Sequence, residues 1–490
     1  MSRTAKALAT ALLLCVVAVA SGCGSARPAP DATNVDVLAS AIRQRIPGGF
    51  VGLSMEYSGV SAYAGSDPTA PNPIFEQLVR NLAPGQRPVL RVGGDTTDWA
   101  WWPVPGMTRP GGMRITLDPH WIAVGHALAR DLNARLIVGV NLEADNARIA
   151  GTMAQALISG IGRAAVSALE LGNEPELYAS FGWYRTPAGR AIPGRAHTWS
   201  FPAFANDFAS IARSLPRVPV AGPNIGSPRW LSLLGPFIAG QPRLGLVAIH
   251  RYPFKHCSAS SAISPSQLLS DAATKGLADG VTGFVALAHA RGEPLRITEM
   301  NGIACGGERG VSDTFASALW ALDALFQMAR VGVDGINIHT ATGRISEMFS
   351  FRRLNGSWRG YVRPIYYGLL TFARAVPAGS TLLRVSGPGG SLSSYATRAP
   401  DGRIRVVLIN KDLGRSRLIA VRAPGDAEGA LQLLRAPSIG ARTGVTLGGR
   451  SFGAPTRSGV LPAPARTIVH KAHGRYVIEL PPATAALLTL

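Results

Sequence analysis

Short apolar runs alternate with longer amphipathic stretches between residues 50 and 376. Eight of the short runs are rich in Val, Ile and Leu with little polar alternation, which is typical of strands covered on both faces. They are Phe50–Met55, Pro88–Gly93, Ala134–Leu142, Val166–Gly172, Val218–Pro223, Gly245–Tyr252, Pro294–Met300 and Gly332–Thr340. Helical patterns follow them, the longest from Ser264 to Ala290. Eight strands alternating with eight helices predict an α/β fold, a (β/α)8 TIM barrel over residues 49–376.

The pattern changes after the predicted barrel. Between residues 377 and 490, short strand-like runs are separated by Gly, Pro and Asp, as in "RIRVVLIN", "SRLIAVRA", "LQLLRA" and "RYVIEL". This spacing predicts a C-terminal antiparallel β-sandwich domain. Residues 24–48 are interpreted as a tether, with a possible first strand of that β-domain at its end.

The first 23 residues have the pattern of an export signal. Arg3 and Lys6 precede the apolar run Ala7–Ala20, which is too short to span a bilayer. "ASGC" resembles the end of a bacterial lipobox, which predicts lipidation at Cys23 and a membrane anchor. Cleavage after Ala20 and free secretion remain the alternative. Both interpretations place the mature protein outside the cytoplasm.

Composition agrees with a folded, exported protein. Hydrophobic residues make up 47% and charged residues 16% of the 490 residues, which is typical of globular chains. The formal net charge of +20 comes almost wholly from arginine, and no zinc-finger spacing or RNA-binding signature accompanies it. We therefore expect no nucleic-acid partner. Attraction to acidic glycans or a cell envelope, and a simple arginine bias, both remain open.

Two cysteines remain once the signal region, with Cys15 and Cys23, is set aside. Cys257 and Cys305 lie a few residues beyond the sixth and seventh predicted strands. In an oxidising compartment we expect them to form a disulfide that joins neighbouring loops. Two buried free thiols are the alternative.

Two glutamates occupy matching places at strand ends. Glu174 in "LELGNEPELY" follows the fourth predicted strand, and Glu299 in "LRITEMNG" lies at the end of the seventh. The C-terminal ends of barrel strands point to one face, so we expect both carboxyl groups there, about 5–5.5 Å apart as in retaining glycosidases. Glu174 is then the acid/base with a raised pKa, and Glu299 the nucleophile. Salt bridges at strand ends are the structural alternative.

Other polar residues accompany this pair. Asn173 is expected to bind the sugar 2-hydroxyl, and Tyr252 to stabilise ionised Glu299 by a hydrogen bond. Further candidates for binding substrate hydroxyls lie at other strand ends: His250, Asp95, Asn141, Glu143 and His339. The tryptophans of "DWAWW" either stack on sugar rings or belong to the core. No His/Cys/Asp cluster has metal-ligand spacing, so neither a metal nor an organic cofactor is expected.

Several stretches together resemble glycoside hydrolase family 79, which includes heparanase and microbial β-glucuronidases. They are "GFVGLSMEYSGV", "LRVGGDTTDW", "LELGNEPELY", "AIHRYP", "ITEMNGIACGGERGVSDTFASALWALD" and "VRPIYYGLLTFA". The resemblance covers about residues 45–490 and implies a (β/α)8 barrel with a C-terminal β-sandwich. It also implies Glu174 as acid/base, Glu299 as nucleophile and Asn173 as the residue preceding the acid.

The chain departs from this family where a uronate carboxylate is held. Family β-glucuronidases use tyrosines and backbone amides from the late loops, but "MNGIACGGERG" and "HTATGRISEMFSF" contain no tyrosine. Arg309 or Arg344 can supply a charged contact instead, or they are solvated loop residues.

The sequence thus predicts a retaining β-glycosidase that acts on glucuronides or uronic-acid glycans. Three alternatives remain: a neutral-sugar glycosidase (β-glucosidase, β-galactosidase or arabinosidase), a non-hydrolytic surface glycan-binding protein, and a structural envelope protein. No feature of the sequence indicates an oligomeric state.

Overall fold

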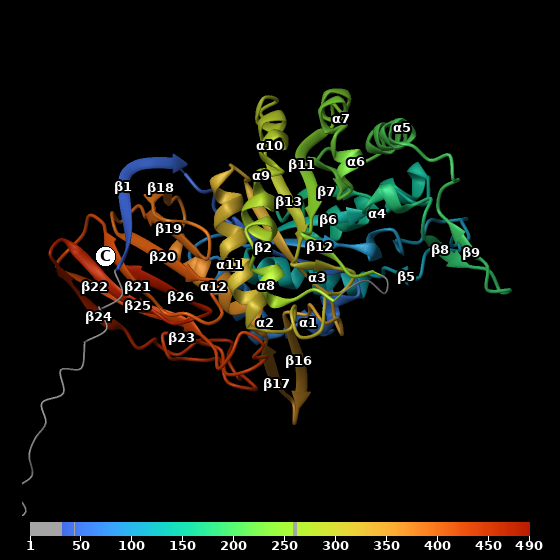
Figure 1. The fold of residues 1–490 in the computed structure, drawn as a ribbon. Helices are drawn as coiled ribbons and strands as arrows, with labels where there is room; N and C mark the ends of the chain where they lie inside the picture. The colour runs from blue at the N-terminus through green and yellow to red at the C-terminus, as the bar shows by residue number, and fades with distance from the viewer. Residues whose placement is uncertain (1–31, 44, 258–261) are drawn as a thin grey trace, which may run out of the picture. The chain divides into compact units, whose positions relative to one another are not determined.

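The structure is a computed structural model that describes residues 32–43, 45–257 and 262–490 (Figure 1). The export signal, Cys23 and the first part of the tether lie outside these residues and stay predictions. Within the described ranges, none of the helices combines the length and the apolar character needed to cross a bilayer.

Eight parallel strands form a closed barrel, as the hydrophobic pattern predicts. They are β2 (Val51–Glu56), β3 (Val89–Gly93), β6 (Arg135–Val140), β7 (Val166–Leu171), β10 (Val220–Ile225), β11 (Leu244–Arg251), β13 (Leu295–Met300) and β15 (Gly335–Thr340). Their order in the barrel follows the sequence, and β15 closes the ring by pairing with β2. The C-terminal ends of all eight parallel strands therefore lie on one face of the barrel.

Helices connect successive strands and cover the barrel. The longer ones are α2 (Pro73–Leu82), α3 (Pro119–Leu132), α4 (Ala147–Ile161), α5 (Phe201–Ala212), α7 (Leu234–Gly240), α10 (Thr282–His289), α11 (Phe315–Arg330) and α12 (Pro364–Ala375). Short elements α1 (Gly59–Ala64) and α6 (Pro228–Leu231) precede α2 and α7. At the start of α3 the Asp118 carboxylate accepts a hydrogen bond from the Trp121 amide, with Pro119 in the first turn.

The helix predicted from Ser264 to Ala290 is the main difference in the barrel. It is divided into α8 (Pro265–Leu268), η3 (Ala272–Gly276), α9 (Leu277–Asp279) and α10. Two glycines, Gly276 and Gly280, lower the helix propensity of its middle. The carbonyl of Ala273 there accepts a hydrogen bond of 3.0 Å from the Trp320 indole of α11, so this segment is also held by tertiary packing.

Short strand pairs extend from the loops of the barrel. They are β4 (Ala100–Trp101) with β5 (Ile115–Thr116), β8 (Gly182–Arg185) with β9 (Ala191–Pro193), β12 (Phe254–Lys255) with β14 (Ile303–Ala304), and β16 (Phe349–Leu354) with β17 (Ser357–Val362).

The C-terminal β-domain is a ten-stranded sheet with its own apolar core. Its strands are β1 (Thr33–Arg43), β18 (Thr381–Ser386), β19 (Leu392–Arg398), β20 (Ile404–Asn410), β21 (Arg417–Arg422), β22 (Glu428–Arg435), β23 (Thr446–Leu447), β24 (Thr467–Ala472), β25 (Arg475–Leu480) and β26 (Thr484–Thr489). The N-terminal β1 inserts between β18 and β21, and its pairing with β21 is parallel. A further pairing of β22 with β26 closes the sheet on itself.

Helices α11 and α12 are covered on both sides, by the barrel strands and by the β-domain (Figure 1). Asp323 of α11 is fully buried and accepts a hydrogen bond from Lys411, which follows β20, over 3.2 Å. The same ammonium group lies 2.7 Å from Asp271. A buried carboxylate needs such a partner, so this contact links the barrel helix specifically to the β-domain.

Candidate active site

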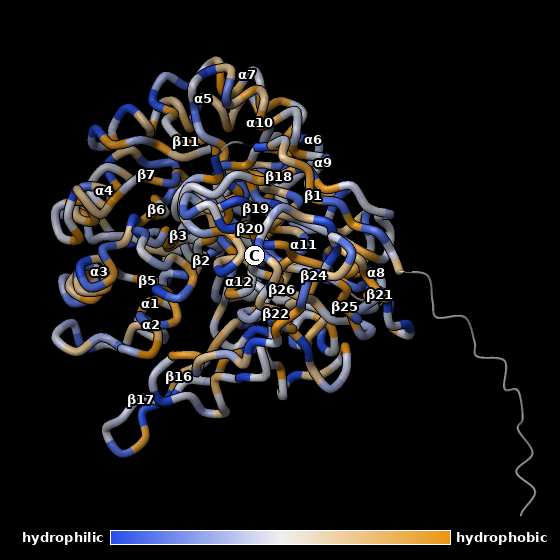
Figure 2. The backbone as a smooth tube through the Cα atoms, turned by 90° about the vertical axis from the view of Figure 1, so that its left-hand side faces the viewer, coloured by the Kyte–Doolittle hydropathy of each residue, from blue (hydrophilic) through white to orange (hydrophobic). Residues whose placement is uncertain are grey.

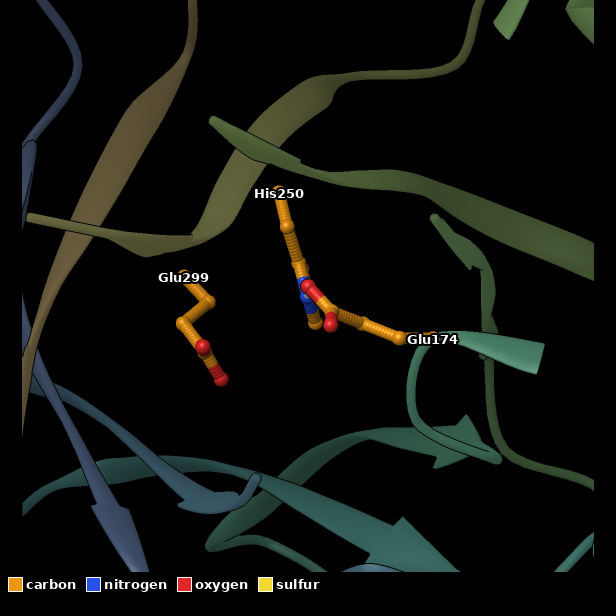
Figure 3. A group of neighbouring side chains, drawn as sticks. All are labelled: Glu174, His250 and Glu299. Atoms are coloured by element: carbon orange, nitrogen blue, oxygen red, sulfur yellow. Dashed lines mark hydrogen bonds and ion pairs between the residues drawn. The ribbon is translucent and has the colours of Figure 1, made fainter. Parts of the chain in front are cut away.

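Two carboxylates meet at the C-terminal end of the barrel. Glu299 lies in β13, the seventh barrel strand, and Glu174 follows β7, the fourth. One oxygen of each carboxylate and one ring nitrogen of His250 all lie within 4.8 Å of one another (Figure 3). Two acids that are 125 positions apart in the chain thus face each other over a distance that one glycosidic bond can bridge.

The Glu299 carboxylate is surrounded by hydrogen-bond donors. The Tyr252 hydroxyl donates to Oε1 over 2.7 Å, and Nη1 of Arg91 donates to Oε2 over 2.5 Å. Burial disfavours its ionised form, but His339, His250, Arg91 and the Tyr252 hydrogen bond outweigh burial and hold the pKa of Glu299 well below its usual range. Glu299 is therefore suited to remain ionised.

Glu174 is held differently. Its backbone has φ 45° and ψ 55°, a left-handed conformation that costs a glutamate about 1–3 kcal/mol. The Glu174 amide donates to the Asn224 carbonyl over 3.0 Å, and Oε1 lies 3.1 Å from Nδ1 of the buried His250. The loop after β10 lies against this carboxylate, since a Cβ on Gly226 would lie 3.4 Å from Oε1. Surrounding contacts thus impose the position of Glu174.

Asn173 is positioned by its backbone and by its side chain. Its amide donates to Oδ2 of Asp98 over 2.9 Å, and its Oδ1 accepts from Nη2 of Arg91 over 2.9 Å. Its Nδ2 lies 3.5 Å from Asp95. Buried Asp98 also accepts from the Tyr178 hydroxyl over 2.7 Å. Asp98 therefore organises the segment that precedes Glu174, a role that the sequence analysis did not predict.

Arg91 is the second residue that the sequence analysis missed. It is fully buried within β3. Burial alone would lower the pKa of Arg91, but the Glu170 and Glu299 carboxylates outweigh burial and raise it. Besides Glu299 and Asn173, its guanidinium donates to Glu170 over 2.5 Å and to Ser54 over 3.1 Å. The sequence does carry a signal, because Arg91 in "VLRVG" and Glu170 in "ALELG" are charged residues inside apolar strands, and buried charges require partners.

His339 and a further acid, Glu56, lie near Glu299. Nδ1 of His339 lies 3.7 Å from Glu299 and 2.9 Å from the Ser54 hydroxyl, and Nε2 lies 3.6 Å from Glu56. Burial and the charge of Glu299 raise the pKa of Glu56 to about 7, although hydrogen bonds from Thr96 act in the opposite direction.

Asp95 adds a second such acid near Glu299. Its side chain stays accessible to solvent. Loss of part of its hydration, with the charges of Glu56 and Glu299, nevertheless raises the pKa of Asp95 to about 7. Both acids therefore hold a proton part of the time near neutral pH, which limits repulsion around Glu299 and provides hydrogen-bond donors.

Asn141, one of the predicted sugar-binding residues, has a different role in the structure. The Asn141 side chain donates to the carbonyls of Asp98 and Ala100 and accepts from the Ala144 amide. It is 1% exposed, so the structure uses it to hold backbone, which corrects the prediction that it binds hydroxyls. Loop geometry decides this outcome, since the side chain satisfies nearby backbone groups.

All three tryptophans of "DWAWW" pack against apolar clusters. Trp101 is buried with Met113, Ile149 and Trp183 in a small apolar cluster. Trp99 lies at the edge of that cluster, and Trp102 packs against the main core. The core interpretation therefore holds for Trp101.

Glu143 is buried in the loop after β6, and burial and the Asp98 charge raise its pKa to about 9. Arg195, which lies close by, opposes this shift. Glu143 is thus suited to donate a hydrogen bond rather than to carry a charge at neutral pH.

Cys257 and Cys305 form a disulfide with a Cα–Cα distance of 5.1 Å. Next to it β12 pairs in parallel with β14. These two contacts join the loops that follow β11 and β13. Tyr252 comes directly after β11, and Glu299 lies in β13.

Glu174, His250 and Glu299 also have the donor atoms of a metal site. However, both Glu299 oxygens accept hydrogen bonds from Tyr252 and Arg91, and the Arg91 guanidinium lies 3.4 Å from Nε2 of His250. A fixed positive charge at this distance disfavours a second cation. The arrangement is better suited to proton transfer and nucleophilic attack than to metal binding.

The loops after β13 and β15 contact each other. The Ser346 amide donates to the Gly306 carbonyl over 3.0 Å, and the Arg344 side chain packs on Gly306. Both Arg309 and Arg344 are exposed, and no carboxylate of the described residues lies within 4.0 Å of either guanidinium. Both remain available for an anionic group.

Comparisons with known proteins agree with this geometry. The chain is 25% identical over 439 residues to a β-glucuronidase of Neurospora crassa, which covers 78% of this chain and 75% of the relative. It is 23% identical over 398 residues to a β-glucuronidase of Aspergillus niger, covering 74% and 71%. No protein-family model matches.

Solved structures share the fold. A 4-O-α-L-rhamnosyl-β-D-glucuronidase from Fusarium oxysporum superposes with a TM-score of 0.73 at 18% identity, covering 94% of this chain and 100% of that one. A GH51 arabinofuranosidase from Xanthomonas axonopodis pv. citri has a TM-score of 0.64 at 15% identity, covering 94% and 99%. With the carboxylate pair at the barrel end, these similarities support a glycoside hydrolase with a carbohydrate substrate.

Proposed function

We propose that the protein is a retaining β-glycosidase that hydrolyses β-glucuronides or glycans that contain uronic acids. The approach of the Glu174 and Glu299 oxygens to within 4.8 Å carries this proposal, because retaining enzymes need closely spaced carboxyl groups. The unequal surroundings of the two acids support the assignment of roles. Glu299 is held ionised by donors, and Glu174 lies against an imidazole.

In the first step, Oε1 or Oε2 of Glu299 attacks the anomeric carbon while Glu174 donates its proton to the departing oxygen. In the second step, Glu174 takes a proton from water, and the water oxygen displaces Glu299 from the sugar. The Asn173 amide is suited to bind the sugar 2-hydroxyl during both steps. Arg91 holds Asn173 and Glu299 through one guanidinium, which fixes their relative position.

The glucuronate preference is inferred from the relatives, both β-glucuronidases, and from available arginines. Arg309 and Arg344 are proposed to bind the uronate carboxylate, since an arginine–carboxylate contact is charge-assisted. We also propose that the protein acts outside the cytoplasm and is anchored through lipid on Cys23. Mass spectrometry of the mature N-terminus tests the anchor.

The decisive experiment compares wild type, Glu299→Gln and Glu174→Gln with Glu428→Gln, an exposed glutamate of β22, as the matched control. With an aryl β-glucuronide, Glu299→Gln should lose at least about 10³-fold in kcat, and the control should be unchanged. Glu174→Gln should slow the hydrolysis of substrates with poor leaving groups far more than that of substrates with activated leaving groups, because only the poor leaving groups need a proton to depart. Equal turnover by wild type and Glu299→Gln would refute the assignment of Glu299 as the nucleophile.

Two further measurements complete the test. NMR of the first product formed should show the β-anomer, and an α-anomer would exclude a retaining mechanism. A panel of aryl β-glucosides, β-galactosides and α-L-arabinofuranosides tests the neutral-sugar alternative. Glycan binding without hydrolysis of any substrate would favour a surface glycan-binding protein.

A further inference from the structure

The hairpin β16–β17 projects from the loop that follows the last barrel strand (Figure 1). One of its faces is packed: Phe349 and Phe351 make edge contacts with Phe75 of α2 at ring distances of 5.6 and 5.9 Å. The other face points away from this aromatic cluster, because side chains alternate along a strand. The hairpin is therefore anchored on one side and free on the other.

The free face presents two arginines directly opposite each other. Arg352 of β16 pairs in register with Arg359 of β17, so their side chains emerge side by side on one face. Tyr361, two residues beyond Arg359, lies on the same face, and its ring centre is 5.8 Å from the Arg352 guanidinium.

A third arginine comes from the β-domain. Gly360 and Thr456 form an isolated antiparallel bridge with two backbone hydrogen bonds of 3.0 and 2.8 Å. This register places Arg457, the next residue after Thr456, beside Arg359 on the neighbouring segment. We refer to Arg352, Arg359 and Arg457 as the arginine row.

The arginine row has no counter-charge. Across residues 32–43, 45–257 and 262–490, no Asp or Glu oxygen lies within 4.0 Å of these three guanidinium groups, whereas Arg363 at the end of the hairpin pairs with Glu347 over 3.4 Å. Like charges placed directly opposite each other destabilise a strand pair. A bound anion would relieve that repulsion, and the net charge of +20 adds a favourable field for polyanions.

We propose that the arginine row binds the carboxylates of an anionic polysaccharide at a site separate from the Glu174–Glu299 pair. The choice of a uronate-containing glycan rests on the proposed function. Neighbouring strands lie about 4.8 Å apart, close to the advance of a glycan chain per sugar, so successive arginines can meet successive sugars. The Tyr361 ring beside them offers an apolar face to a sugar.

The test measures binding of a fluorescently labelled oligoglucuronate, in which every sugar carries a carboxylate, by anisotropy, with Glu299→Gln present in every protein so that the probe stays intact. Arg352→Gln/Arg359→Gln/Arg457→Gln should bind about tenfold more weakly and with a reduced salt dependence. The charge-matched control is Arg213→Gln/Arg291→Gln/Arg403→Gln, three exposed arginines away from the hairpin, and it should bind as the parent does.

Several outcomes would overturn the inference. Equal affinity of the row variant and the control variant is one, and binding of phosphatidylglycerol vesicles but not of the oligosaccharide is another. A matching melting temperature shows that the row variant is folded. With Glu299 intact, the row variant should hydrolyse a small aryl β-glucuronide as wild type does. If no protein hydrolyses it but row-dependent binding persists, the proposed function fails and this inference stands.

Discussion

The Tyr252 hydroxyl donates a hydrogen bond of 2.7 Å to Oε1 of Glu299, from the loop after the strand next to it. This bond favours the ionised carboxylate, as does Arg91 on the other oxygen. Tyr252 therefore acts on the chemistry through the proton affinity of Glu299.

Tyr252→Phe should raise the pKa of Glu299, because the donor is lost while the ring remains. An ionised nucleophile then requires a higher pH, so the acidic limb of the kcat/KM profile should move upward by about one pH unit. Tyr184→Phe in β8 serves as the control and should leave the limb in place. An unmoved acidic limb in Tyr252→Phe would show that this hydroxyl does not control Glu299.

Glu176 lies two residues beyond Glu174 and fastens the loop after β10. Its Oε1 accepts from the amides of Gly226 and Ser227 over 2.6 and 2.7 Å, while buried Oε2 has no hydrogen-bond partner among the residues that the structure describes. Burial and the nearby Glu174 charge raise the pKa of Glu176 to about 7. Once ionised, Glu176 places a negative charge close to the Glu174 carboxylate.

Glu176→Gln should therefore change the kcat/KM profile near neutral pH, because the variant has no carboxyl group at this position that titrates near 7. Glutamine keeps an acceptor for both amides but removes the negative charge that forms beside Glu174 as the pH rises. The other groups near Glu174, His250 and Glu299, are unchanged. A kcat/KM profile that coincides with that of Glu428→Gln would contradict this role.

The predictable part of this molecule is the part encoded locally. Barrel strands such as β6 contain continuous apolar runs, here Leu136–Val140, and the C-terminal ends of the strands in such a parallel barrel share one face. The pairing of Glu174 with Glu299 followed from that numbering, and the oxygens do approach within 4.8 Å.

The parts that were missed depend on contacts between distant segments. Arg91 is explained only once β3 and β7 are known to place it against Glu170 inside one barrel. The role of Asn141 depends on the fold of the neighbouring loop, where backbone groups claim its amide. The parallel insertion of β1 next to β21 joins residues that are hundreds of positions apart, and no local pattern encodes such a pairing.

Asp98→Asn should destabilise the protein and disturb Asn173. The hydrogen-bond partners of the carboxylate are all donors: the amides of Leu142, Glu143 and Asn173 and the Tyr178 hydroxyl lie 2.7–3.1 Å away. An asparagine amide turns a donor toward some of them, and lost buried hydrogen bonds should cost about 2–4 kcal/mol. Chemical denaturation measures this loss. An unchanged unfolding midpoint would show that Asp98 is not required for the segment before Glu174.

Cys257→Ser/Cys305→Ser should lower stability more than activity. The disulfide closes a segment of 48 residues, which contributes up to about 4 kcal/mol through the entropy of the unfolded chain. Glu299 and His250 lie within barrel strands that remain paired without the bridge, so kcat should change little at temperatures well below unfolding. Thermal melts and turnover of an aryl β-glucuronide measure the two effects, and a reductant should lower the melting temperature of wild type but not of the variant. A variant that melts with oxidised wild type yet loses turnover would reverse this interpretation and assign the bridge to loop positioning.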